Sequence, residues 1–229
     1  YVELMTADYS QIEMRIMAHL SEDQGLIEAF NSGEDLHRFV GARVFGVDPA
    51  DVTPTMRTKV KAMSYGLAYG LSAYGLSQQL GIGTDEAAGM MEDYFTRFGG
   101  VRDYLQEVVE RARVDGYTQT LWGRRRYLPD LNSDNRQRRE MAERMALNAP
   151  IQGSAADIMK IALFRIHQDL RDSDLRSRVL LQIHDELIVE APEAKAENVA
   201  AMLADAMSGV IDIGVPLAVD TAIGDNWGE

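Results

Sequence analysis

Two groups of acidic residues in this 229-residue sequence have types and spacings suited to metal chemistry. Asp8 stands where an apolar run changes to helical spacing, so a strand would end there with its carboxylate fixed in position. His184-Asp185-Glu186 lies between two apolar, β-rich runs and predicts a hairpin with a charged tip. Adjacent carboxylates repel each other unless a cation neutralises them, and Mg²⁺ prefers such oxygen ligands. A helix cap at Asp8 or Ser10, and a simple polar turn at the tip, are the plainer alternatives.

A third group combines positive charge with aromatic rings. Arg57, Lys61, Tyr65 and Tyr69 recur every four residues, so a helix would carry them along one flank. Two cations can hold phosphates, and an aromatic ring two turns later can stack on a base. The same spacing also fits a basic surface helix with tyrosines in the core.

A weaker basic group follows in the second half of the chain. Residues 111–144 hold 9 basic and 5 acidic residues, and the arginines at 124–126 are expected on a turn. Arg144, Asn148 and Gln152 are spaced by four across an expected helix end, and Asn and Gln can hydrogen-bond base edges. A solvated surface explains the arginine runs equally well.

The elements that must position these groups predict an α+β fold, mostly helical with a small antiparallel sheet. Strands are expected over residues 2–7, 117–122, 179–183, 187–191 and 216–221. Helices are expected over 11–20, 23–30, 35–45, 54–65 or beyond, 84–98, 101–114, 135–147, 154–170 and 193–207. Pro150 and Gly153 should separate two of these helices, and Gly66, Gly70 and Gly75 should loosen the chain.

Charge and composition bound the possible functions. The formal charge of −13 argues against a nucleic-acid partner, yet residues 57–184 carry +3 between two acidic ends. The absence of cysteine excludes disulfides and thiolate metal sites and fits a cytoplasmic protein. No apolar run is long enough for a membrane helix. The N-terminus has no signal peptide and starts like a strand already under way, so we expect a fragment of a longer protein.

Together these motifs resemble those of the bacterial DNA polymerase I family (family A), in the family's order and over essentially the whole chain. Asp8-Tyr9-Ser10-Gln11-Ile12-Glu13 resembles motif A, Arg57-x3-Lys61-x3-Tyr65-Gly66-x2-Tyr69-Gly70 motif B, and His184-Asp185-Glu186 motif C. Arg144-x3-Asn148-Ala149-Pro150-Ile151-Gln152-Gly153 also follows a family pattern. The resemblance implies a right-hand polymerase palm, a small antiparallel sheet with helices, and an inserted, mainly helical fingers subdomain. The palm would comprise 1–30 and 148–229 and the fingers 31–147, with no counterpart of the thumb or the exonuclease-like domain.

The resemblance also implies template-directed DNA synthesis, in which a dNTP transfers its nucleotidyl group to a primer 3′-hydroxyl by a two-metal-ion mechanism. Asp8, Asp185 and the carbonyl of Tyr9 would hold two Mg²⁺ ions, for which Mn²⁺ can substitute, and Glu186 would assist. Lys61 would also donate a proton to the leaving group. The implied nucleotide-binding residues are Arg57, Lys61, Tyr65, Glu13, His37 and Gln11. The implied primer–template DNA contacts are Tyr69, Arg144, Asn148, Gln152 and His184.

Two positions define the implied substrate. Glu13 matches the family's steric gate, which leaves no room for a 2′-hydroxyl and so favours dNTPs over rNTPs. Tyr65 stands where many members have Phe, and its hydroxyl predicts weak discrimination against dideoxynucleotides. The parent enzyme is expected to be a cytoplasmic monomer that acts in DNA replication or repair, without a membrane. The alternatives are a single-subunit RNA polymerase, which lacks the gate glutamate, and a non-catalytic nucleic-acid-binding relative, which is expected to lose a metal aspartate.

Overall fold

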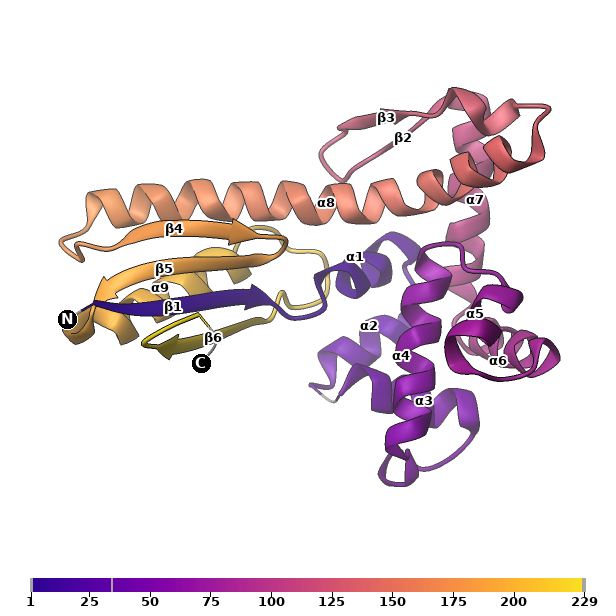
Figure 1. Ribbon diagram of the computed structural model, residues 1–229, viewed down its shortest axis with the longest axis horizontal. Coiled ribbons are helices and arrows are strands. Elements are labelled where there is room, and N and C mark those ends of the chain that lie inside the picture. The colour runs from indigo at the N-terminus through magenta and orange to yellow at the C-terminus, as the bar shows by residue number, and fades with distance from the viewer. Residues whose placement is uncertain (1, 34, 228–229) are drawn as a thin grey trace. The chain divides into compact units, whose positions relative to one another are not determined.

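The computed structural model describes residues 2–33 and 35–227 (Figure 1). The chain divides into two compact units, which are described one at a time. The sheet unit comprises Tyr1–Glu13 and Ser154–Glu229, and the helical unit comprises Met14–Gly153. In the part of the chain that the structure describes, no helix combines the length and the apolar character needed to cross a membrane.

The sheet unit contains a four-stranded antiparallel sheet. Its strands are β1 (Val2–Tyr9), β4 (Arg178–Ile183), β5 (Glu186–Pro192) and β6 (Val219–Gly224), in the order β4-β5-β1-β6. Side chains alternate between the two faces of a strand, so Met5 and Ala7 of β1 and their partners Val189 and Leu187 of β5 all turn to one buried face. This face forms the core of the unit.

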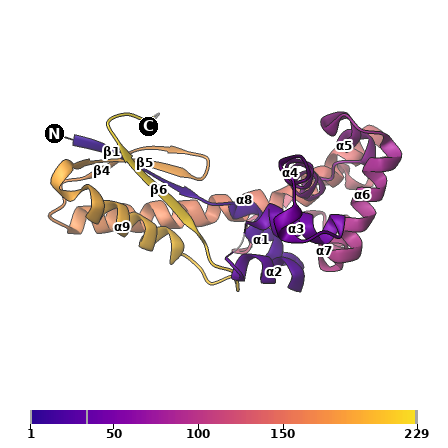
Figure 2. The same cartoon turned by 90° about the horizontal axis from the view of Figure 1, so that it is seen from below.

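Two helices cover that apolar face (Figure 2). One is α9 (Ala196–Ser208), and the other is the part of α8 (Arg136–Asp172) that follows Gly153. Val199 and Leu203 of α9, and Ile158 and Ile166 of α8, are completely buried. Because the helices cover one face only, the other face of the sheet is free to carry polar side chains.

The helical unit is built from short helices and one small two-stranded sheet. Its helices are α1 (Ile12–Ser21, from Met14 on), α2 (Gln24–Asn31), α3 (Leu36–Phe45), α4 (Pro54–Ala68), α5 (Ala73–Leu80), α6 (Thr84–Arg97), α7 (Gly99–Asp115) and the first part of α8. Strands β2 (Tyr117–Gln119) and β3 (Arg125–Tyr127) form the small sheet. The buried carboxylate of Asp23 joins two of these elements, since it accepts hydrogen bonds from the backbone N–H of Leu26 in α2 (3.1 Å) and of Gly100 in α7 (2.9 Å).

The α+β class is confirmed, and so are most of the expected elements. The N-terminal strand, the four helices up to α4, the β4–β5 hairpin and the C-terminal helix all form near the expected positions. Thr53 caps α4 as its sequence predicts, because its side chain accepts a hydrogen bond from Met56 N (3.2 Å) and Pro54 takes the first helical position. The expected subdomain limits at residues 30 and 147 stay predictions.

The break expected at Pro150 and Gly153 is wrong. Residues expected as two helices, 135–147 and 154–170, form the single 37-residue helix α8, with Pro150 inside it. A proline in a helix interior costs about 3 kcal/mol, chiefly through one lost hydrogen bond and a steric clash. Ala146 and Ile151, on either side of Pro150, are completely buried, and this packing offsets the cost.

The strand expected over 117–122 is also too long, and the arginines at 124–126 are not all in a turn. The strand ends at Gln119 and the turn lies at its end, so Arg125 and Arg126 belong to β3. Gly123 has a φ of 76°, a left-handed conformation that glycine adopts without strain. The turn therefore lies just before the glycine, inside the run that looks like a strand.

Two further differences concern glycine and proline. Helix α5 was not expected because of Gly75, but Ser72 caps it by accepting a hydrogen bond from Gly75 N (3.2 Å). A Cβ at Gly75 would lie 2.5 Å from Leu71 Cδ1, so the glycine serves a close contact within a helix that still forms. The last strand begins at Val219 and not at Pro216, because proline has no N–H to donate to a ladder.

Candidate functional site

A row of carboxylates crosses the polar face of the sheet unit. In the strand register, Asp8 of β1 lies between Glu186 of β5 and Asp220 of β6. Asp185 precedes Glu186 in the turn between β4 and β5. We refer to Asp8, Asp185, Glu186 and Asp220 as the carboxylate row. The sequence predicted three of these four residues as a group, and the structure brings them together from separate segments.

Local backbone interactions fix the position of the row. His184, in the tight turn, has a φ of 52°, and Gln182 Nε2 donates a hydrogen bond to its carbonyl oxygen (3.0 Å). The backbone N–H of Tyr9 donates to the carbonyl of Asp185 (3.2 Å), which ties the turn to the end of β1. The buried Tyr9 hydroxyl donates to the carbonyl of Met207 in α9 (2.7 Å). Asp8 therefore lies near the end of a strand that is anchored on both sides.

The negative charges of the row act on one another. The pKa of Asp8 is raised to about 6, first by partial burial of the carboxyl group and then by the charges of Asp185, Glu186 and Asp220. A carboxyl group in this state gains from any cation placed beside it. The row therefore has the electrostatics of a cation-binding site and not of a surface salt-bridge network.

The donor chemistry of the row fits a hard divalent cation. Among the residues that the structure describes, no three His, Cys, Asp or Glu side chains form a ready-made metal cage. Mg²⁺ seldom uses such a cage, because it retains several waters and binds through one or two carboxylates together with substrate phosphates. Asp8 and Asp185 can supply those two carboxylates. The donor chemistry of Asp8 and Asp185 is therefore compatible with such a cation.

The link between β1 and α1 carries two more predicted residues. Gln11 has a φ of 57°, so the chain turns sharply after the strand, and its Oε1 is buried with no hydrogen-bond partner in the described ranges. Glu13 follows in the first turn of α1 and is half-buried. The sheet unit thus holds Glu13 on the same short segment as Asp8.

In the helical unit, the predicted flank of α4 lines a cavity of about 1040 Å³. Lys61 and Tyr65 of α4, Tyr69 at its C-terminal end and Arg144 of α8 all contribute to the walls. Gly70 follows with a φ of 69°, and a Cβ there would lie 2.8 Å from a methyl carbon of Leu147. Glycine at this position allows α8 to approach and close that side of the cavity.

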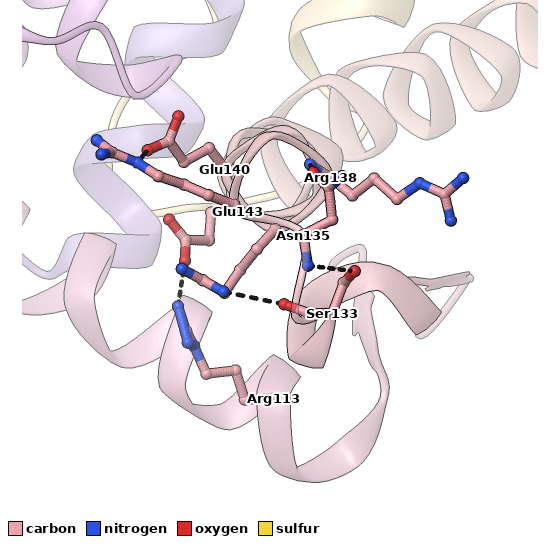
Figure 3. Close-up of polar contacts among 8 residues, drawn as sticks. Arg113, Ser133, Asn135, Arg138, Glu140 and Glu143 are labelled. Carbon is pink, nitrogen blue, oxygen red and sulfur yellow. Dashed lines mark hydrogen bonds and ion pairs between the residues drawn. The ribbon is translucent and has the colours of Figure 1, made fainter.

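The wall formed by α8 is held by a polar cluster at the start of that helix (Figure 3). Asn135 donates its backbone N–H to Ser133 Oγ (3.2 Å), which fixes the turn before the helix. Arg113 of α7 forms an ion pair with Glu143 of α8. Arg136, Glu140 and Glu143 all line the cavity, so the ion pairs that anchor the helix also lie on a cavity whose α4 side carries Lys61.

Arg57 does not line this cavity. Its guanidinium instead makes a two-pronged pair with the Asp35 carboxylate, with Nε 3.1 Å from Oδ1 and Nη2 2.8 Å from Oδ2. This pair lowers the pKa of Asp35, chiefly through the hydrogen bond from Arg57. Asp35 was not singled out from the sequence, although it is also the N-cap of α3. An anion that binds Arg57 would have to compete with this carboxylate.

His37 lies close to the same cations and is almost completely buried. Its ring centroid is 6.0 Å from that of Tyr65, and its Nδ1 has no hydrogen-bond partner within residues 2–33 and 35–227. Burial, followed by the charges of Arg57 and Lys61, lowers the pKa of His37 to about 4 against an opposing effect of Asp35. His37 is therefore neutral at pH 7.

This buried histidine predicts a pH-dependent stability. Between pH 6.5 and 4 the unfolded chain binds a proton that folded His37 does not. The free energy of unfolding therefore decreases as the pH is lowered through this range. The expected loss between about pH 7.5 and about pH 5 is about 2 kcal/mol. Chemical denaturation of the chain and of His37→Gln at both pH values measures it, with the exposed His167→Gln as control. Equal pH dependence in the chain and in His37→Gln would contradict the assignment.

Two predicted DNA contacts also do not line the cavity. Asn148 follows Arg144 by one turn of α8, and its Oδ1 is buried without a hydrogen-bond partner in the described part of the chain. Gln152, one turn further, is exposed. Both remain predictions, but the continuous helix keeps the three residues on one flank, as their spacing by four requires.

Comparison with known proteins places these features in a family. Residues 1–229 match the family model described as DNA polymerase family A. DNA polymerase I of Mycobacterium tuberculosis is 64% identical over 227 residues, which cover 99% of this chain and 25% of the relative. The thermostable DNA polymerase I of Thermus thermophilus is 47% identical over 224 residues, covering 98% and 27%. The chain thus spans about a quarter of the length of the curated relatives it matches.

A solved structure is similar as well. It is described as the POL domain of Pol1 from M. smegmatis in complex with DNA primer-template and dNTP. The TM-score is 0.95 at 63% sequence identity, over 98% of this chain and 40% of that one. The fold is accordingly that of a family A polymerase domain. With a family model that matches every residue and this structural similarity, the chain belongs to DNA polymerase family A.

Proposed function

We propose that the chain carries the nucleotidyl-transfer site of a template-directed DNA polymerase, which adds dNTPs to a primer 3′-hydroxyl. The observation that carries the proposal is the carboxylate row, in which Asp8 lies between Glu186 and Asp220 and has a pKa raised to about 6. Four negative side chains gathered on one sheet face are unfavourable unless a cation binds there. The similar M. smegmatis domain, solved with primer-template and dNTP, supports the choice of substrates.

Asp8, Asp185 and the carbonyl of Tyr9 would hold two Mg²⁺ ions. Bound there, the ions would stabilise the charge on the attacking and leaving oxygens of the transfer. Glu186 accepts a hydrogen bond from Trp227 Nε1 (3.4 Å) and would add negative charge without ligating directly. The anchored turn would keep the two aspartates in a fixed relation through the reaction, so that little reorganisation is needed.

The helical unit would bind the incoming nucleotide through α4. Lys61 and Arg57 would hold the triphosphate, and Arg57 would exchange its Asp35 partner for a phosphate oxygen. Neutral His37 would donate a ring N–H to the same group. Tyr65 and Tyr69 would lie against the nucleotide and the templating base, on the wall of the 1040 Å³ cavity.

Proton movement follows from the same residues. The primer hydroxyl must lose a proton as it attacks the α-phosphorus, and the pyrophosphate that leaves gains negative charge. The ammonium of Lys61 would donate a proton to that leaving group. Arg144, Asn148, Gln152 and His184 would contact the minor groove of the primer–template, where acceptors occupy similar positions in every base pair. Contacts of that kind suit an enzyme that must copy any sequence.

Primer extension tests this function directly. The protein to use is a chimera in which the chain replaces the matching 227 residues of the M. tuberculosis DNA polymerase I, hereafter the chimeric polymerase. With one dNTP supplied at a time, we expect a single added nucleotide only where the dNTP complements the templating base. Addition that ignores the template, or no addition by a chimera that is folded and binds DNA, would contradict the proposal.

A further inference from the structure

The β2–β3 hairpin has one face that packs on the helical unit and a second face on which Tyr127 is exposed and Tyr117 is half-buried. Thr118 pairs with Arg126 in the register; Thr118 is 5% exposed, and the Arg126 guanidinium reaches Met145 Sδ of α8 (3.6 Å). Because side chains alternate, the neighbouring pairs turn the other way. These pairs are Tyr117 with Tyr127 and Gln119 with Arg125. We refer to these four residues, together with Trp122 in the connecting turn, as the hairpin face.

The hairpin face is rich in exposed aromatic surface. Tyr127 is 68% exposed and Trp122 is 44% exposed. All three residues of β3 are exposed, so that strand buries no side chain in the helical unit. Single exposed rings are common on protein surfaces, whereas rings that contact one another can mark an interaction site. The exposed rings belong to a two-stranded element that gains little stability from them.

The rings are also held in a fixed arrangement. The guanidinium of Arg125 lies over the Tyr117 ring, 4.3 Å from its centroid. The rings of Tyr117 and Tyr127 meet edge to face, with centroids 5.7 Å apart and an interplanar angle of 61°. Arg125 therefore packs on Tyr117, which in turn packs against Tyr127. This lowers the entropy that the side chains would lose when a flat ligand stacks on them.

The hairpin itself is anchored to α8 at its turn. Arg124 Nη2 donates to the carbonyl of Gly153 (2.9 Å), and the Arg124 backbone N–H donates to Thr120 Oγ1 (3.2 Å). A Cβ at Gly153 would lie 2.6 Å from Thr120 Cγ2, so glycine permits the hairpin to sit directly on the helix. The hairpin face is thus displayed on a rigid support, as a binding surface requires.

Arginines are concentrated in the segment that carries this face, in an otherwise acidic chain. Residues 122–139 contain six arginines and two aspartates, whereas the whole chain carries −13. Such a local reversal attracts an anionic partner to this surface. Exposed rings between guanidinium groups are typical of surfaces that bind single-stranded nucleic acid, because unpaired bases can stack while the backbone meets the cations. A duplex offers no free base faces along its length.

We propose that the hairpin face binds single-stranded DNA, with bases stacked on Trp122 and Tyr127 and a phosphate near Arg125. The surface lies apart from the 1040 Å³ cavity, since none of its residues lines that cavity. The assignment of this strand as unpaired template rests on the proposed function. Binding of single-stranded DNA to the face does not, because it needs neither metal nor dNTP.

Tryptophan fluorescence tests the stacking directly. The chain has two tryptophans, so Trp227→Phe leaves Trp122 as the only reporter. Titration of this variant with a twelve-residue oligo-dT, in EDTA and low salt, is expected to quench its emission. A base-paired hairpin DNA of the same charge should quench it much less. Unchanged emission with oligo-dT, or equal quenching by both DNAs, would overturn the proposal.

Binding by fluorescence anisotropy supplies the energetic test with labelled oligo-dT. Tyr127→Ala and Trp122→Ala are each expected to weaken binding by about 10-fold, in keeping with the loss of one stacked base. Tyr127→Leu keeps apolar bulk and should still lose affinity, which separates stacking from folding. Phe164→Ala and Arg171→Gln remove an exposed ring and an exposed cation elsewhere and should change little.

The two proposals can fail separately. If the variants of the hairpin face bind oligo-dT as tightly as the unchanged chain, this inference is wrong even when the chimeric polymerase extends primers. If they lose affinity while the chimeric polymerase adds nucleotides without regard to template, the proposed function is wrong and the binding surface stands.

Discussion

Asp185→Asn is expected to lower single-turnover primer extension by the chimeric polymerase about 10³-fold or more. The substitution keeps the size of the side chain and removes one of the two carboxylates that would hold the metal ions. Asparagine still fits the turn, because the hydrogen bond that ties it to β1 is made by the backbone carbonyl of residue 185. The loss should therefore be in the rate at saturating dNTP and not in folding.

Three further variants test whether this loss is specific to the carboxylate row. Asp8→Asn should cause a loss of similar size, since it removes the other proposed ligand. Asp174→Asn neutralises an exposed carboxylate in the loop before β4 and should leave extension unchanged. Asp220→Asn removes charge beside Asp8 without removing a proposed ligand, so its effect should be much smaller. Normal turnover in Asp185→Asn or Asp8→Asn would contradict the metal assignment.

The spacing of residues along the sequence was enough to predict the parts of the site that lie on a single helix or turn. The four-residue repeat from Arg57 to Tyr69 forms helix α4 and its C-terminal cap, and the charged tip after Ile183 forms a tight turn. Both features depend on interactions between near neighbours in the chain. Side-chain periodicity and a capping threonine are visible in the sequence, and they are enough to predict them.

Residues contributed by distant segments could not be predicted in this way. Asp220 joins the carboxylate row only because β6 pairs with β1 in a register that sets Asp8 opposite it. Nothing local to a strand specifies its partner or its register, because both are decided by packing of the whole sheet. Asp35 was missed for the same reason, since its bond to Arg57 joins α3 to α4.

Pro150 shows a related limit. A proline followed closely by a glycine ordinarily ends a helix, and on local grounds a break was the better prediction. Helix α8 continues because Ala146, Ile151 and Ser154 are completely buried around the proline. That burial depends on residues remote in sequence. The consequence is functional, because an unbroken helix keeps Arg144, Asn148 and Gln152 in line.

The net charge of −13 is also better understood from the structure. Taken as an average it argues against a DNA partner. Part of it, however, is gathered in the carboxylate row, where negative charge would be matched by metal ions. Arginines are also concentrated in residues 122–139, the segment that carries most of the hairpin face. Separated charges of this kind suit an enzyme that holds metal ions at one place and a polyanion at another.

Glu13→Ala is expected to raise the relative use of rNTPs by the chimeric polymerase about 10²-fold. Glu13 stands in the first turn of α1, after the sharp turn at Gln11, on the segment that also carries Asp8. If its side chain occupies the space that a 2′-hydroxyl would need, shortening it to a methyl group should admit the ribose. The ratio of kcat/KM for rCTP and dCTP opposite one template base measures the change.

Glu13→Gln separates bulk from charge, because glutamine fills nearly the same volume as glutamate without the negative charge. If Glu13 excludes the ribose by its size, Glu13→Gln should keep most of the preference for dNTPs while Glu13→Ala loses it. If both variants accept rNTPs equally, the carboxylate charge and not its bulk discriminates between the sugars. If neither variant accepts them, Glu13 is no gate, and the choice of sugar must be made by residues on α4 or by the position of the primer end.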